Sequence, residues 1–243
     1  MCIRDRIIDL ISVLEQSGLQ KQKEEVQALV GYIDGMEEKL SQMMDEMKEM
    51  RLEVEKLHDK GIRARCSQLL GTAEGKIHQV KSMVSTAKEN LISSAKQMVQ
   101  TFREKGRSAL CHAVQALRIP SVLSRMGRGF AHAEKSMGQL AVRLDAMREE
   151  LHQAGGHIKN AGLALAGKEP QESKELSADK GVLAKLRSFV LYCGKAFSEM
   201  DRDTALTVER INSGRSSVKT ELQGLKSAQT GQRRQAASKE QAR

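Results

Sequence analysis

The stretch of this 243-residue chain that comes nearest to a chemical motif is a glycine-rich segment that ends in lysine. Gly162 to Glu169 reads GLALAGKE, close to the phosphate-binding loop that ends in Gly-Lys-Ser or Gly-Lys-Thr. Glu169 replaces the hydroxyl that would ligate magnesium, and Pro170 follows where the phosphate-binding helix should continue. We therefore attribute these glycines, together with Gly155 and Gly156, to a bend or a close helix contact, and we expect no nucleotide site.

Histidine, cysteine and serine offer no better site. The histidines and cysteines do not gather at the spacing of zinc ligands, and the adjacent Cys111 and His112 would point in different directions on a helix. Ser93 and Lys96 form a Ser-x-x-Lys pair, but no partner motif accompanies it. We expect no catalytic residue, no metal and no cofactor, and we predict that the chain is not an enzyme.

A basic segment is the strongest candidate for ligand binding. Residues 21–57 carry 6 basic and 10 acidic side chains, whereas residues 58–128 carry 13 basic and 4 acidic ones. A row of cations along a helix can neutralise phosphates without reading a base sequence. The candidate contacts are Arg63, Arg65, Lys76, Lys81, Lys88, Lys96, Arg103 and Arg107.

The basic segment could equally carry its charge without binding any anionic ligand. Its cations either face water, or the acidic segment neutralises them inside the molecule, and the sequence leaves both arrangements open. Phe102 is the only aromatic residue among them, so base stacking and base readout are unsupported. The segment from Val80 to Phe102 is rich in Ser, Ala and Lys, a composition that suits an anionic membrane surface as well as a bundle.

Composition points away from an ordinary globular core. Aromatic residues make up 2% of the chain, so a core has to be built from Leu, Ile, Val, Met and Ala. Only two prolines, Pro120 and Pro170, interrupt the chain, which favours long helices. The four cysteines form no CxxC pair, and no apolar run reaches the roughly 18 residues of a membrane-spanning helix. These features predict a cytoplasmic protein with reduced thiols and no transmembrane segment.

A heptad repeat dominates the stretch from Leu123 to Leu165. Its apolar residues form one narrow stripe along a helix, which is stable in water only when another helix covers it. The small-residue end, Ala154 to Gly167, is where we expect helices to approach most closely. One series is Leu123, Phe130, Met137, Leu144, Leu151, Ile158 and Leu165, and the other is Met126, Ala133, Leu140, Met147, Ala154 and Ala161.

A second heptad repeat runs from Val26 to Leu57. Its Met-rich centre resembles a promiscuous binding face, but the methionines are in register with the repeat, which favours ordinary packing. The register slips near Gly61, where the helix either ends and reverses, as we favour, or continues with a local change of winding. A reversal would lay the acidic helix on the basic one, whereas the acidic helix could otherwise project as a dimerisation arm. The repeat comprises Val26, Leu29, Ile33, Met36, Leu40, Met43, Met47, Met50, Val54 and Leu57.

Glycine and proline positions divide the chain into segments. Ser17-Gly18 predicts a helix stop, Pro120 is the clearest corner, and the last apolar stripe weakens at Thr204, where we expect fraying. The first six residues, MCIRDR, look like a translated sequencing-adapter tag, so Cys2 carries no weight. The predicted segments are a short helix (1–18), an acidic heptad helix (19–60), a basic helix with the Pro120 corner and the central heptad helix (61–166), a linker (167–180), a last helix (181–226) and a disordered basic tail (227–243).

Two motifs give the chain a family resemblance. FREKGRSAL at residues 102–110 and AGGHIKNAGLALAGKE at residues 154–169, together with the heptads, resemble an uncharacterised helical family carried on conjugative and other mobile elements of gut Firmicutes. The resemblance covers Ile7 to about Leu222 and implies an all-helical cytoplasmic accessory protein. It brings no known activity, cofactor or catalytic residue, and Leu163 departs from a more usual basic residue.

The sequence thus predicts an all-α protein, an elongated antiparallel bundle of long helices with coiled-coil packing. Its predicted function is a non-enzymatic scaffold or partner-binding accessory protein, because every strong pattern is an apolar stripe and none is a site. Non-specific nucleic-acid binding through residues 60–128 and peripheral binding to anionic membranes are the alternatives. A homo-oligomer formed through residues 19–60 and an unknown protein partner are further expectations, and the sequence leaves the oligomeric state open.

Overall fold

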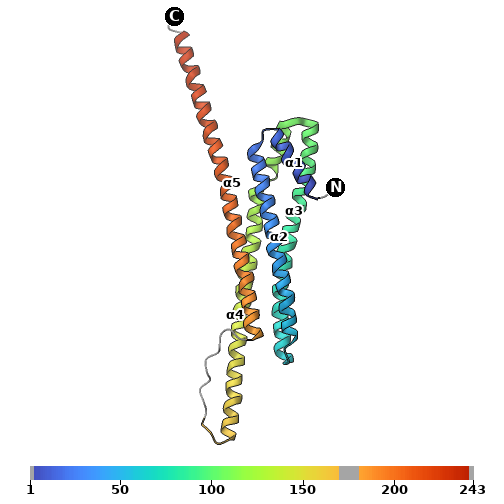
Figure 1. The fold of residues 1–243 in the computed structure, drawn as a ribbon. Helices are drawn as coiled ribbons and strands as arrows, with labels where there is room; N and C mark the ends of the chain where they lie inside the picture. Colours follow the sequence, from blue (N-terminus) through green and yellow to red (C-terminus); the bar gives the residue numbers. More distant parts are fainter. Residues whose placement is uncertain (1–2, 170–180, 241–243) are drawn as a thin grey trace.

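A computed structural model describes the backbone of residues 3–169 and 181–240, and the side chains of residues 6–169 and 181–212. The described residues form five helices and no strand (Figure 1), which confirms the predicted all-α class. The helices are α1 (Ile3–Gln16), α2 (Gln20–Glu55), α3 (Lys60–Ala116), α4 (Ile119–Leu165) and α5 (Val182–Glu240).

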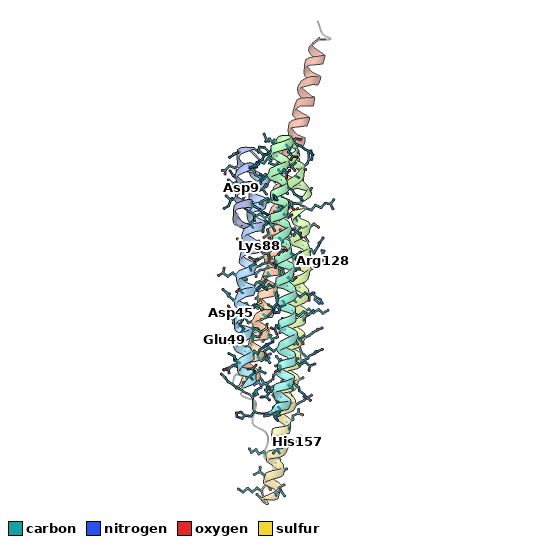
Figure 2. The ribbon with its side chains drawn as sticks, turned by 90° about the vertical axis from the view of Figure 1, so that its right-hand side faces the viewer. Asp9, Asp45, Glu49, Lys88, Arg128 and His157 are labelled. Carbon is teal, nitrogen blue, oxygen red and sulfur yellow. The ribbon has the colours of Figure 1, made fainter. Side chains whose placement is uncertain are left out.

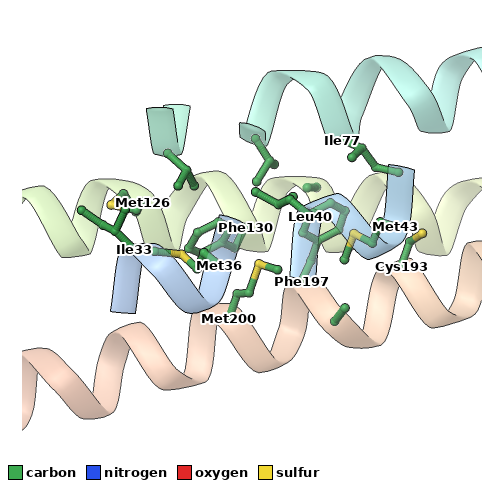
Figure 3. Packing of buried hydrophobic residues seen from close by; sticks show 14 of the residues in the cluster. Ile33, Met36, Leu40, Met43, Ile77, Met126, Phe130, Cys193, Phe197 and Met200 are labelled. Atoms are coloured by element: carbon green, nitrogen blue, oxygen red, sulfur yellow. The ribbon is translucent and has the colours of Figure 1, made fainter. Parts of the chain in front are cut away.

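Four of these helices lie side by side along one long axis, and α1 packs against α2 and α3 at one end (Figure 1). The core runs along the middle of the bundle, where Leu40 of α2, Ile77 of α3, Phe130 of α4 and Phe197 of α5 are all fully buried (Figure 3). The core residues come from the two heptad repeats and from the apolar stripes of α1, α3 and α5. The predicted elongated antiparallel bundle is therefore confirmed.

The Met-rich centre of α2 belongs to this core. Met36, Met43 and Met47 are buried, and Figure 3 shows Met36 and Met43 among side chains of the neighbouring helices. Flexible thioethers fill the irregular spaces that a core with few aromatic rings leaves. Packing, rather than a promiscuous binding face, is thus the role of these methionines in the described structure.

The turns at the two ends of α2 follow the sequence signals. Gly18 takes a φ of +66°, and the amide of Leu19 donates to the carbonyl of Leu14 at 2.9 Å, so the predicted stop of the first helix is confirmed. After α2, the carboxylate of Asp59 accepts from the amide of Ile62 at 2.9 Å and caps α3. The chain therefore reverses close to Gly61, as we favoured, and the acidic helix folds back on the basic one.

The helix break predicted at Pro120 is present, since α3 ends at Ala116 and α4 begins at Ile119, but the chain reverses earlier, at Gly106. Gly106 has a φ of +78°, a conformation that costs glycine little. Met83 of α3 and Gly129 of α4 are equally far from Gly106 in the sequence, and a Cβ added to Gly129 would contact Met83. This contact is what a reversal at Gly106 predicts, because it brings residues at equal distances on its two sides together. Pro120 stands in the first turn of α4, where its missing N–H is tolerated, and Arg118 before it takes a φ of +46°.

The closest helix approach lies near the start of α4, which corrects our expectation for Ala154 to Gly167. A Cβ on Gly129 would lie 2.6 Å from Sδ of Met83 in α3, and a Cβ on Gly127 would lie 2.8 Å from Oδ1 of Asp201 in α5, whereas a Cβ on Gly155 or Gly162 would meet nothing within 4 Å. The reason is that α5 does not extend along the far end of α4. Figures 1 and 2 show that end of α4 projecting beyond the other helices.

The last helix is longer than predicted. α5 continues to Glu240, so the expected disordered tail at 227–243 is wrong for residues 227–240. This segment has no apolar repeat, but it lacks proline and is rich in Ala, Gln, Lys and Arg, which favour helix. Most of the predicted linker at 167–180 and the last three residues lie outside the described residues.

Candidate partner-binding surface

An apolar stripe without a covering helix lies on the projecting end of α4. Leu144 of the same heptad series is 1% exposed, but Ile158 is 75% exposed and Leu165 is 91% exposed. Leu151 is half-buried, and Ala154 and Ala161 are exposed. We call these five residues, Leu151, Ala154, Ile158, Ala161 and Leu165, the uncovered stripe. Figure 2 shows His157, which lies next to Ile158 in the sequence, on the projecting end of α4.

The neighbouring helices end where this stripe begins. Arg187, in the second turn of α5, pairs with Asp145 of α4. Arg65, in the second turn of α3, has Nη1 3.6 Å from the Glu150 carboxylate of α4. Both α3 and α5 therefore begin beside residues 145–150 of α4. The apolar residues of α4 before this point pack against these helices, whereas those after Leu151 have no neighbouring helix among the described residues.

The projecting end stops at a capped terminus. Gly167 takes a φ of +66°, and the amide of Lys168 donates to the carbonyl of Leu163 at 2.9 Å. The segment that nearly matches a phosphate loop is therefore the carbonyl end of a helix, whose partial negative charge repels anions. Phosphate-binding loops use the opposite, amide end.

Charged side chains flank the uncovered stripe unevenly. Arg148, Glu149 and Glu150 lie at its N-terminal side, and Lys159, Lys168 and Glu169 lie along its C-terminal side. The two halves of the projecting end therefore differ in charge sign. An antiparallel neighbour with the same distribution would place unlike charges opposite each other.

The eight candidate cations for nucleic-acid binding do not form a single row. Lys88 lies between Asp34 and Glu37 of α2, and the hydrogen bond to Glu37 raises the pKa of its ammonium group. Arg65 and Lys76 instead face α4, where Lys76 has Nζ 3.4 Å from Nε2 of His132. Of the others, Lys81, Lys96, Arg103 and Arg107 are exposed and Arg63 is half-buried. Arg107 comes after the reversal at Gly106, so it does not extend the line of cations along the first part of α3.

Ion pairs join the acidic helix to two neighbours. Besides the Lys88 contacts, Arg51 of α2 pairs with Glu74 of α3. At the same end of the bundle, Lys185 of α5 donates to Glu53 of α2 at 2.9 Å. This hydrogen bond, aided by Lys56, lowers the pKa of the Glu53 carboxyl to about 2. Part of the charge imbalance between the segments is thus neutralised inside the molecule.

A polar contact that the sequence did not reveal ties α2 to α5. The hydroxyl of Tyr32 forms a hydrogen bond with the hydroxyl of Thr204, which is buried and donates to the carbonyl of Met200 at 2.7 Å. Burial raises the pKa of Tyr32 to about 12. We expected fraying at Thr204, but its hydroxyl is satisfied and α5 continues through it. The one sequence signal for this contact was the polar Thr204 at an apolar position of the last stripe, which indicated that its hydroxyl needs a hydrogen-bond partner.

The comparisons with known proteins place the chain in a family. The model of DUF6674, a family of unknown function, matches residues 4–243, which is nearly the whole chain. The chain belongs to the DUF6674 family. This membership confirms the expected resemblance to an uncharacterised helical family, while carriage on mobile elements stays a prediction. No curated protein and no solved structure matches the chain.

The remaining chemical candidates of this DUF6674 member lie apart from one another. Cys66 and Cys193 are fully buried, as the repeat predicted, and burial raises the pKa of both thiols, that of Cys193 to about 12. Thiols of this kind are poor nucleophiles. Within the described parts of the chain, no three His, Cys, Asp or Glu side chains form a group that could hold a metal. None of the helices described there is long and apolar enough to cross a membrane.

Proposed function

We propose that the chain is a non-enzymatic scaffold that binds an amphipathic helix of a partner along the uncovered stripe of α4. One observation carries this proposal: the heptad repeat continues unbroken from the core into a segment where Ile158 and Leu165 are largely exposed. Full burial of such a side chain stabilises an assembly by about 1.5 to 3 kcal/mol. A stripe of this kind is a recurrent docking surface for a helix.

The covered part of α4 indicates what the partner should look like. There, α5 lies antiparallel to α4 and contributes apolar side chains such as Phe197 and Val190. In the uncovered stripe, Ala154 and Ala161 alternate with larger residues and leave room for large partner side chains. We therefore expect an occupant helix with its own apolar repeat.

Nucleic-acid or membrane binding by the basic segment has less support. Lys88 is held by two carboxylates of α2, and the other candidate cations face different neighbours or water. A phosphate backbone needs cations along a shared path. Both functions remain alternatives that a salt-dependent binding measurement with duplex DNA or anionic vesicles would detect.

The proposal is tested by cross-linking in lysate of cells that express the chain. Ile158→Glu places a charge on the uncovered stripe, and Val142→Glu is the matched control, since Val142 is also apolar and 68% exposed on α4. We expect cross-links from residues 148–168 to a helical segment in the wild type and the control, and their loss in Ile158→Glu. Equal cross-linking by all three chains, or no cross-link to this segment, would overturn the proposal.

A further inference from the structure

We infer that the occupant of the uncovered stripe is the same segment of a second copy, so that two chains pair through the projecting ends of α4 in antiparallel orientation. The inference rests on the proposed function, because it names the helix that the stripe binds. Three properties of the projecting end support it: its side-chain sizes, its charges and its access.

The side-chain sizes complement each other when the segment is paired with itself in reverse. With the two-fold axis between Lys159 and Asn160, Leu165 of one copy lies opposite Ala154 of the other, and Ile158 lies opposite Ala161. Each layer then combines a large and a small residue, which fills space evenly. A parallel pair would instead set Ile158 against Ile158 and Ala154 against Ala154, giving alternately crowded and hollow layers.

The charges favour the same orientation. Arg148, Glu149 and Glu150 stand at the N-terminal side of the segment and sum to −1, whereas Lys159, Lys168 and Glu169 stand at its C-terminal side and sum to +1. Antiparallel pairing brings the carboxylates of one copy towards the ammonium groups of the other, whereas parallel pairing brings like charges together. Glu150 is also near Arg65 of its own chain, so Glu149 has the larger share in this contrast.

Access and contact size fit a reversible dimer. The projecting end extends beyond the first residues of α3 and α5, so a second helix reaches the stripe without displacing either (Figure 2). The shared segment spans about four helical turns, which is short of the roughly 1,200 Å² that a stable interface buries. We therefore expect a dissociation constant in the micromolar range or above, and an assembly that depends on concentration.

Sedimentation velocity across a concentration series tests the association. The wild type should sediment as a single chain of 26.9 kDa when dilute and shift towards twice that mass as the concentration rises. Ile158→Glu should remain a single chain throughout, and Val142→Glu should behave like the wild type. Because Ile158 is exposed in the single chain, circular dichroism should show the same helicity and melting temperature for all three when dilute. A wild type that stays monomeric, or an Ile158→Glu variant that dimerises equally well, would overturn the inference.

Spin-label distances test the orientation. Labels are placed at His157 and, in a separate chain, at Lys168, after Cys2 and Cys111 have been replaced by Ser. In an antiparallel pair the separation along the helices grows by about 3 Å per residue from the two-fold axis, so labels at Lys168 should be roughly 15 Å farther apart than labels at His157. Equal distances at the two positions would show a parallel pair and refute the inference.

The same chains separate this inference from the proposed function. If the wild type stays monomeric but residues 148–168 cross-link to another protein in an Ile158-dependent way, the proposed function stands and the self-pairing is wrong. If neither a second copy nor another protein contacts the segment, both fail. Growth beyond two chains would indicate head-to-tail contact between different surfaces and would also refute two-fold pairing.

Discussion

The two halves of α4 share one heptad repeat but differ in what covers them. From Leu123 to Met147 the repeat is buried against α5 and the rest of the bundle, whereas Ile158 and Leu165 face away from every described helix. No change in the apolar pattern marks the boundary, because the boundary is set by where α3 and α5 have their first residues. A heptad repeat therefore shows that a helix needs a partner, but not whether the same chain supplies it.

The largest expected difference between the halves comes from truncating the same heptad position in each. Phe130→Ala removes a fully buried ring and should lower the free energy of unfolding by about 3 to 5 kcal/mol. Ile158→Ala should change it by no more than about 0.5 kcal/mol in the dilute, single chain. Urea unfolding followed by circular dichroism measures both values. Similar losses for the two variants would mean that the projecting end is covered in solution.

Glycines of α4 provide a second test, of intermediate size. Gly127→Ala inserts a methyl group 3.3 Å from Cγ2 of the buried Thr204 and close to Asp201, so it should destabilise the chain by about 1 to 2 kcal/mol. Gly138→Ala lies on the same helix with open space around it and should stabilise the chain by up to about 1 kcal/mol. Thermal unfolding should show opposite signs. Stabilisation by both substitutions would contradict the close approach of α4 and α5.

Tyr32→Phe tests the polar contact that supports the covered half. Loss of the hydrogen bond to Thr204 should cost about 1 kcal/mol near neutral pH. The folded pKa of Tyr32, about 12, lies above the ordinary value of about 10, so its contribution to stability is complete below pH 10 and is lost as the pH rises towards 12. The difference between wild type and variant should therefore shrink above pH 10. A constant difference across this range in urea unfolding would argue against the half-buried environment of Tyr32.

The smallest expected effect concerns the ion pair between α2 and α5. The folded pKa of Glu53, about 2, lies below the ordinary value of about 4.3, so its contribution to stability is present above pH 4.3 and is lost as the pH falls towards 2. In Glu53→Gln the free energy of unfolding should fall less steeply over this range than in the wild type. Lys185→Gln should flatten the curve in the same way, and an unchanged slope in both variants would show that the pair is not formed.

Much of the fold followed from local signals in the sequence. Gly18 ends the first helix because a left-handed cap suits glycine, and the Met-rich repeat of α2 is buried because its register matches the core. Cys66 and Cys193 lie at apolar positions of their repeats and are buried for the same reason. These features depend on a few neighbouring residues, and so the sequence reveals them.

The features that the sequence did not reveal depend on distant parts of the chain. Gly106 looked like one glycine among many, and only the pairing of α3 with α4 selects it over Pro120 as the point of reversal. Leu165 is exposed because neither α3 nor α5 extends to it, and the apolar pattern of α4 carries no information on where those helices begin. The contact between Thr204 and Tyr32, which lies far away in the sequence, depends on how α2 packs against α5.

The reversal at Gly106 constrains how such a chain can change length during evolution. Residues in contact between α3 and α4, such as Lys76 and His132, lie on opposite sides of this glycine in the sequence and at similar distances from it. Removal of seven residues from one side alone would shift every facing pair by about 10 Å. Relatives of different length should therefore gain or lose whole heptads in matched sets on both sides, with the glycine kept at the fold.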